Sequence, residues 1–321
     1  MAHVQANHHP LFIIIFNAFS NYYICSSNPS QDPSIDSSLE GSANKLKPPP
    51  AVAPKPDLTP LTGGYRRTPV LQVGADIYCD TRLILMELER RFPEPTLYPE
   101  DLTAEANMIA HWAESQFFRP VSLYVSGSNL DVLPPNLQAD RSRMRGLPEP
   151  SEATIRRAAR RAAPAVRVQV RWIEELLSDG RDWIAGPNVS VADLSIYHAL
   201  WFFTARTDRL AFELDGCPRI RAWIARVASF GNGTMTTMFP REAIDVAAAS
   251  EPAEALISAP FDEDPPLGSR VRVRADDYGR DPVEGELVQI DRERLALVRE
   301  DPSVGTIAVH FPRLGYDIRE V

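Results

Sequence analysis

The fold is decided by a stretch that reads RTPVLQV at residues 67–73 and IYCDT at residues 77–81. Both parts are short and apolar, as strands are, and the turn-forming residues 74–76 join them. After Asp80, which stands where a helix cap would stand, apolar residues recur near helical spacing as far as Phe92. The stretch therefore predicts two short strands joined by a tight turn, followed by a helix that begins beside an acid and a hydroxyl.

This stretch resembles the second half of the N-terminal domain of glutathione transferases. In that family a cis-proline exposes backbone groups that pair with glutathione, and the resemblance implies this role for Thr68 and Pro69. It also implies that Asp80 and Thr81 hold the γ-glutamyl end of the tripeptide at the helix start. Plain helix capping explains the same pair well, so that alternative stays open. Arg67 is a candidate to bind a glutathione carboxylate, and a solvated surface arginine is the other interpretation.

A second resemblance lies in WIAG at residues 183–186 and in the apolar helix that follows. Ser190 and Asp193 have the spacing of a capping box, in which the acid reaches back to the start of the helix. The segment closely resembles the signature of the glutathione transferase C-terminal domain. The resemblance implies that Asp193 is structural and that it binds no ligand.

Other segments complete a helical domain. A long helix capped by Ser151 runs to Leu177, and Pro164 should kink it or divide it in two. Further helices are expected at residues 218–229 and 240–249. The aromatic residues of this domain are more typical of core than of an apolar co-substrate cleft. They are Trp112, Phe117, Phe118, Tyr124, Trp201, Phe202 and Phe203.

The expected fold class is α+β multidomain. The resemblance runs from about residue 48 to 250 and implies a partial thioredoxin-like, glutathione-binding domain at 47–100 and an all-α transferase C-terminal domain at 101–250. Residues 1–46 show no helix or strand period, so an irregular leader is expected there, and the family's first strand and helix look replaced.

The end of the chain has a different pattern. Residues 251–266 are acidic and contain proline, which indicates a linker. Residues 267–321 predict a small all-β C-terminal appendage outside the family's core pattern. Its strands are expected at 271–274, 285–290, 294–298 and 306–311.

The totals argue against several classes of protein. A net charge of -9 argues against nucleic-acid binding, which uses a basic face. The three cysteines form no CxxC pair, so a reducing, cytoplasmic location is expected and a disulfide framework is not. The apolar run at residues 11–16 is far shorter than the ~20 residues of a membrane helix, so no membrane partner is expected. No metal site is expected either, because metal-ligand spacing is missing around His111, His198 and His310.

The leading function is conjugation of glutathione, as co-substrate, with an apolar electrophile, as in detoxification; a homodimer is left open. The family activates the thiol through a Tyr, Ser or Cys after its first strand. The corresponding stretch has no helix behind it, so no catalytic residue is assigned from Tyr22, Tyr23, Cys25, Ser26 and Ser27. Cys79 is expected to be a buried strand residue. The alternative is a non-catalytic family member that binds a thiol ligand or serves as a protein-interaction scaffold.

Overall fold

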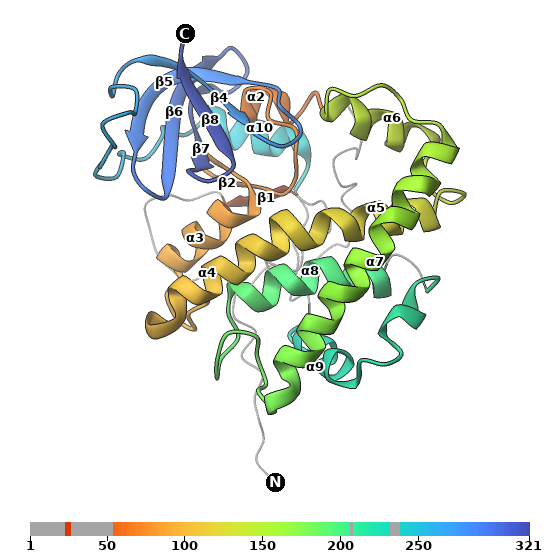
Figure 1. Ribbon diagram of the computed structural model, residues 1–321. Helices are drawn as coiled ribbons and strands as arrows, with labels where there is room; N and C mark the ends of the chain where they lie inside the picture. The colour runs from red at the N-terminus through yellow and green to blue at the C-terminus, as the bar shows by residue number, and fades with distance from the viewer. Residues whose placement is uncertain (1–22, 27–53, 206–207, 232–237) are drawn as a thin grey trace. The chain divides into compact units, whose positions relative to one another are not determined.

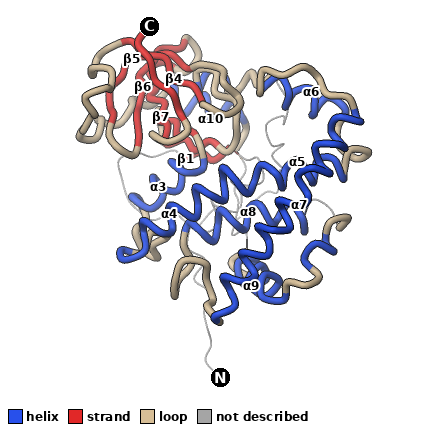
Figure 2. The backbone as a smooth tube through the Cα atoms, viewed as in Figure 1, coloured by secondary structure: helices blue, strands red, loops and turns tan. Residues whose placement is uncertain are grey.

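The computed structural model divides into two compact units (Figure 1). It describes residues 23–26, 54–205, 208–231 and 238–321. We call residues 92–139 and 149–231 the helical unit, and the other described residues the sheet unit. All the described strands belong to the sheet unit, and Figure 2 distinguishes them from the helices by colour. The predicted α+β multidomain class is confirmed.

The sheet unit contains one eight-stranded sheet with the strand order β1-β2-β3-β7-β6-β5-β4-β8. The strands are β1 (Tyr23–Ser26), β2 (Val70–Val73), β3 (Asp76–Cys79), β4 (Arg270–Ala275), β5 (Val283–Ile290), β6 (Arg294–Asp301), β7 (Gly305–Pro312) and β8 (Tyr316–Glu320). The helices are α2 (Thr59–Thr62), α3 (Thr81–Arg91) and α10 (Pro240–Ala248). The four strands predicted after the linker are confirmed as β4 to β7, whereas β8 was not predicted.

The strands of the appendage continue the sheet that the first hairpin begins. β3 pairs in parallel with β7, so that Asp76 lies opposite Ala308 and Tyr78 lies opposite His310. One apolar core runs along this sheet and includes residues of both parts, such as Val70 and Phe311. The sequence assigned these strands to separate domains at 47–100 and 267–321. A small β unit buries little apolar surface alone, and sharing a sheet and core supplies what it lacks.

The leader and α10 also differ from expectation. The sequence predicted no regular structure before residue 47, and the structure has β1 at Tyr23–Ser26, paired in parallel with β2. The sequence placed the helix near 240–249 in the helical domain. In the structure α10 belongs to the sheet unit, because Ala243, Ile244 and Ala247 lie in the core of the sheet.

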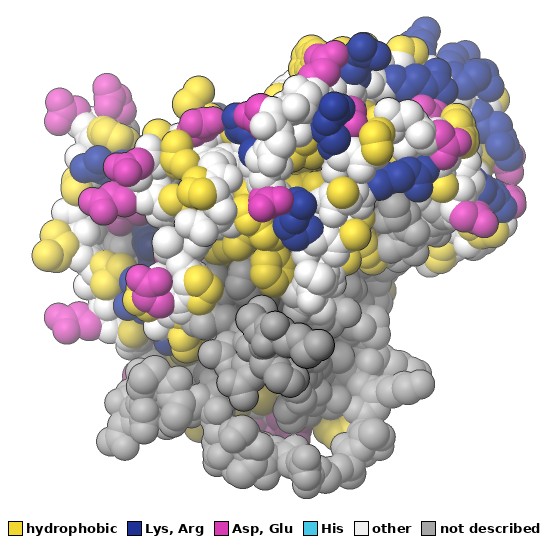
Figure 3. All heavy atoms as spheres, turned by 90° about the horizontal axis from the view of Figure 1, so that it is seen from below, with side chains coloured by type: hydrophobic (Ala, Val, Ile, Leu, Met, Phe, Trp, Pro, Cys, Tyr) yellow, Lys and Arg dark blue, Asp and Glu magenta, His cyan; other side chains and the backbone are white. Residues whose placement is uncertain are grey.

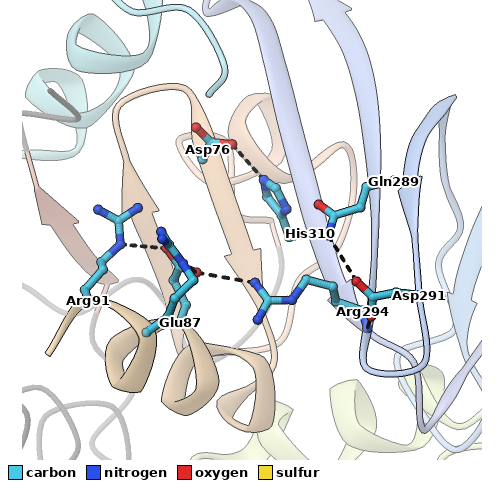
Figure 4. A network of polar contacts seen from close by, with 8 residues as sticks. Asp76, Glu87, Arg91, Gln289, Asp291, Arg294 and His310 are labelled. Carbon is cyan, nitrogen blue, oxygen red and sulfur yellow. Dashed lines mark hydrogen bonds and ion pairs between the residues drawn. The ribbon is translucent and has the colours of Figure 1, made fainter. Parts of the chain in front are cut away.

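Two polar clusters reinforce the sheet unit where β3 and α3 meet the appended strands (Figure 4). His310 Nε2 lies 2.7 Å from Asp76 Oδ1, and the imidazole stacks on the Tyr78 ring at 4.4 Å. Glu87 of α3 accepts hydrogen bonds from Arg90 and Arg91 and forms an ion pair with Arg294 of β6. Burial opposes the charge of Glu87, but the hydrogen bonds and charges of Arg90 and Arg91 outweigh it and lower its pKa to about 2.

The helical unit is built on α4 (Thr103–Trp112), α5 (Phe118–Ser128), α7 (Glu152–Leu176), α8 (Val191–Ala205) and α9 (Pro218–Ala228). Short turns are η1 (Glu100–Leu102), the π-helical η2 (Ala113–Phe117), η3 (Leu177–Asp179) and η4 (Ala211–Leu214). α6 (Pro135–Met144) begins in this unit and ends in the sheet unit. The Ser151 cap is confirmed, since its hydroxyl accepts the Thr154 N–H at 3.2 Å. α7 runs through Pro164 as one helix, so division there is wrong.

The surface of α7 is strongly basic in its first half, although the whole chain is acidic. Arg156, Arg157, Arg160 and Arg161 are all exposed there. Figure 3 shows one face of the molecule, on which Lys and Arg side chains gather toward one side. In the part of the chain that the structure describes, no helix is both long and apolar enough to span a membrane.

The predicted role of Asp193 as a buried cap acid is confirmed. Its Oδ2 accepts the Ser190 N–H and hydroxyl, each at 3.0 Å. Its Oδ1 accepts the Ile184 N–H at 2.8 Å and the Trp223 indole N–H at 2.9 Å. One fully buried carboxylate thus ties the start of α8 to the WIAG segment and to α9.

Candidate functional site

The β2–β3 hairpin brings the two halves of the predicted site together. The strands are antiparallel with Val70 opposite Cys79, so the residues before β2 meet the residues after β3 at the open end of the hairpin. The Thr68–Pro69 peptide is cis, as predicted. It therefore lies at the end of the hairpin where Asp80 and Thr81 begin α3.

Asp80 takes an uncommon backbone conformation at the start of α3. Its φ is +77°, which Asp tolerates better than most residues. Its Oδ1 accepts the Arg82 N–H at 3.0 Å, which is the hydrogen bond of a helix cap. Its Oδ2 accepts the phenol of Tyr316, the first residue of β8, at 3.0 Å. The cap interpretation is therefore confirmed, and the second oxygen faces a residue that sequence analysis did not consider.

Tyr316 belongs to a small aromatic cluster beside Asp80. Its hydroxyl lies 3.4 Å from that of Tyr65, and the ring centroids of Tyr316 and Phe311 are 5.3 Å apart. Burial and the Asp80 carboxylate raise the pKa of the Tyr316 and Tyr65 phenols well above their usual range. Both phenols therefore stay protonated at neutral pH, which keeps Tyr316 a hydrogen-bond donor to the carboxylate.

Arg67 is held by the loop between β4 and β5. Its guanidinium lies 3.9 Å over the Tyr278 ring, and it donates to the Tyr278 carbonyl and to the Asp277 carboxylate. Gly279 has a φ of +61°, and a side chain there would collide with Met144 and crowd Arg67. The Arg67 side chain is only 11% exposed, so it is not the solvated surface arginine that was one of the two interpretations.

Other residues raised by the sequence take less direct positions. Cys79 is fully buried, and burial raises the pKa of its thiol well above the usual range, so it is a strand residue as predicted. Tyr22 and Ser27 lie outside the described residues, and Tyr23, Cys25 and Ser26 are described only as the backbone of β1. No three His, Cys, Asp or Glu side chains in the described ranges cluster as metal ligands would.

Sequence analysis missed the residues of the appendage that reach the hairpin. Tyr316 meets Asp80 from a position 236 residues further along the chain, and Tyr278 meets Arg67 across 211 residues. No local pattern encodes such a meeting. The alternating pattern of apolar residues after residue 266 was the available signal. It predicted the strands but not the strands with which they pair.

Comparisons with known proteins agree with this fold. Residues 157–226 match the family model described as glutathione S-transferase, C-terminal domain. A GST-like protein from Pseudomonas syringae has a solved structure that matches with a TM-score of 0.68 and 33% sequence identity, over 85% of this chain and 88% of that chain. The chain belongs to the glutathione S-transferase family. The matched 85% of the chain is longer than residues 48–250. The structural likeness therefore extends beyond the region of the sequence resemblance.

Two curated proteins are also similar to this glutathione S-transferase family member, over shorter stretches. Human glutathione S-transferase theta-2 is 27% identical over 172 residues, which cover 51% of this chain and 61% of that protein. FtsZ-localized protein A of Caulobacter vibrioides is 28% identical over 121 residues, which cover 37% of this chain and 46% of that protein. This chain thus spans less than two thirds of the length of either relative.

Proposed function

We propose that this chain binds glutathione at the open end of the β2–β3 hairpin and reacts its thiol with an electrophilic small molecule. The observation that carries the proposal is the meeting of the cis Thr68–Pro69 backbone with Asp80 at the start of α3. Membership of the glutathione S-transferase family supports it. Because a fold alone does not give an activity, the proposal rests on these groups and on their chemistry.

The groups at this site suit the two charges of a γ-glutamyl end. The N–H and C=O of Thr68 can pair with the peptide backbone of the ligand, and the amides at the start of α3 attract its carboxylate. Asp80 accepts from its ammonium. A carboxylate offers about four lone-pair positions. The Tyr316 phenol takes one of them at Oδ2, and the ammonium is expected to replace that phenol.

Substitution of Asp80 by Asn tests the binding part of the proposal. Asn keeps the cap but removes the charge, and a hydrogen bond to a charged group contributes about 1.5–3 kcal/mol, or about 10- to 100-fold in Kd. We expect calorimetric titration to show glutathione binding weakened by that factor in Asp80→Asn and unchanged in Asp262→Asn, an exposed acid of the linker. Equal affinities of Asp80→Asn and the parent would remove Asp80 from the site. No binding by any of the three would remove the proposal.

A second candidate function is non-catalytic: a thiol-ligand binder or a protein-interaction scaffold. It is favoured by the contacts that already engage Asp80 and Arg67, since Tyr316 and Tyr278 hold both side chains. The name of one relative, FtsZ-localized protein A, places that protein with another protein. Under this candidate the site keeps its ligand groups and lacks an activated thiol.

A conjugation assay separates the two candidates. The rate with a generic aryl halide is measured for this chain and for a version in which the first strand and helix of another family member replace residues 1–46, at matched folded fraction. The first candidate predicts conjugation by this chain well above the uncatalysed rate. The second predicts little or none, with faster conjugation by the other version, because thiol activation needs a donor within hydrogen-bond reach. Equal, robust rates would contradict the second candidate. A cytoplasmic location and a detoxifying role belong to the first candidate.

A further inference from the structure

β8 forms one edge of the sheet, because among the described strands β4 is its neighbour and it ends the strand order. The hydrogen bonds from Val321 N–H to the Arg270 carbonyl and from Asp276 N–H to the Gly315 carbonyl fix the phase of its pairing with β4. In an antiparallel pair every second residue bonds to its partner strand. Residues 317 and 319 therefore turn their backbone groups toward β4. Residues 316, 318 and 320 turn theirs away from the sheet, as a template for another strand.

We propose that β8 pairs antiparallel with β8 of a second copy of this chain, across a two-fold axis at Ile318. In this register Ile318 lies opposite its own copy, and Tyr316 lies opposite Glu320 of the other copy. These are the residues whose N–H and C=O groups point outward, so each opposed pair exchanges two hydrogen bonds. The contact is isologous, since the same five residues serve both copies.

Charge selects this register over its neighbours. Asp317 of one copy lies opposite Arg319 of the other, twice in the dimer, at the positions where side chains of paired strands approach most closely. Centring the axis on Asp317 would oppose two carboxylates, and centring it on Arg319 would oppose two guanidinium groups. Axes that fall between residues would pair outward-facing backbone groups with inward-facing ones. Within one chain Asp317 already pairs with Arg319 of the same strand at 2.9 Å and with Arg274 of β4 at 3.2 Å, so the dimer extends an existing cluster of charges.

A hollow of about 510 Å³ borders β8, and it is lined by all five residues of this strand together with Arg313 and residues 263–266. Tyr316 and Ile318 pack against the core of the sheet unit, which fixes the face that each β8 side chain occupies. The register is therefore set before the partner arrives, because slipping by one residue would turn these apolar side chains out of the core.

Two charge reversals test the proposal, with sedimentation equilibrium as the readout. Asp317→Arg opposes Arg to Arg between copies, and Arg319→Asp opposes Asp to Asp, so each variant alone should dimerise at least about 10-fold more weakly than the parent. An equimolar mixture of the two variants restores both opposite-charge pairs and should dimerise again. The double variant Asp317→Arg/Arg319→Asp should also dimerise with itself, which guards against a single variant that folds poorly.

Hydrogen exchange gives a second, backbone-level readout on the parent chain. The amides of Tyr316, Ile318 and Glu320 should exchange more slowly as protein concentration rises, whereas the amides that face β4 should not change. A monomeric parent chain would overturn the proposal. So would single variants that dimerise as tightly as the parent, because the contact would then lie on another surface. A mixture of variants that stays monomeric while both are folded would overturn it too.

Discussion

Two carboxylates at helix starts show how differently the two units use the same group. Asp193 in the helical unit is fully buried, and four donors from its own unit occupy both of its oxygens. Asp80 in the sheet unit is half-buried, and only one of its oxygens caps its helix, while the other accepts the Tyr316 phenol. Asp193 is therefore committed to the fold. Asp80 gives one oxygen to its helix, and its other oxygen accepts a hydrogen bond from a phenol at the far end of the chain.

Removal of the Asp193 carboxylate is expected to give the largest loss of stability. Asp193→Ala leaves buried donors of Ile184, Ser190 and Trp223 without an acceptor, which costs about 3–5 kcal/mol. Denaturant unfolding of the full chain measures this loss, with Asp262→Ala as the exposed control. An Asp193→Ala variant with the same unfolding free energy as the parent would contradict this comparison, because Asp193 would then contribute no more to stability than Asp80.

Glu87 provides a buried acid within the sheet unit, with an expected effect that depends on pH. Its pKa is about 2 in the folded chain and near 4.5 when unfolded, so its ionised form stabilises the fold by about 3 kcal/mol at neutral pH. Since the folded pKa is the lower one, this stability is present above about pH 4.5 and is lost as the pH falls toward 2.

The measurement compares unfolding free energies of the parent and Glu87→Gln at a series of pH values from 7 to about 3. The gap between the two should be widest at neutral pH and should narrow steadily below about pH 4.5. A gap that stays constant over this range would mean that the ion pairs with Arg90, Arg91 and Arg294 add nothing to stability.

Asp80→Asn should have a much smaller effect on stability than either change. Asn caps helices as well as Asp does and tolerates a positive φ, so we expect a loss below about 1 kcal/mol. Asp80→Ala should lose more, about 1–2 kcal/mol, because it removes both the cap and that tolerance. Thermal melts of the two variants check this order. A loss from Asp80→Asn as large as that from Asp193→Ala would show that Asp80, too, is committed to the fold.

The sequence was sufficient for features that neighbouring residues determine. The hairpin, the Ser151 and Asp193 caps and four of the appended strands follow from turn residues, cap residues and periodicity. The cis Thr68–Pro69 bond was predicted from the family resemblance alone. The sequence was insufficient for the pairing of β3 with β7, because the residues of a strand carry no local mark of the strand with which it pairs. β8 was missed because its five residues are mostly polar and give a weak period.

The candidate site divides in the same way. The sequence, through its family resemblance, placed Asp80, Thr81 and the cis-proline together, and the structure brings them to one end of a hairpin. It left Arg67 between a ligand role and solvent, and the structure gives it a third environment against Tyr278. Tyr316 could not be predicted, since its position depends on a fold of the appendage that only the complete sheet defines.

The central claim is that Asp80 binds the ammonium of the ligand, and that the Tyr316 phenol is hydrogen-bonded to Asp80 Oδ2 until the ligand binds. The most direct test is calorimetric titration of the parent and Tyr316→Phe with glutathione and with a des-amino analogue that lacks the γ-glutamyl ammonium. Tyr316→Phe removes a hydrogen bond to Asp80, worth about 1 kcal/mol, that the ammonium would otherwise have to displace. The variant should therefore bind glutathione about 3- to 10-fold more tightly, with no gain in affinity for the analogue. Unchanged or weaker glutathione binding by Tyr316→Phe, or an equal gain for both ligands, would contradict the account.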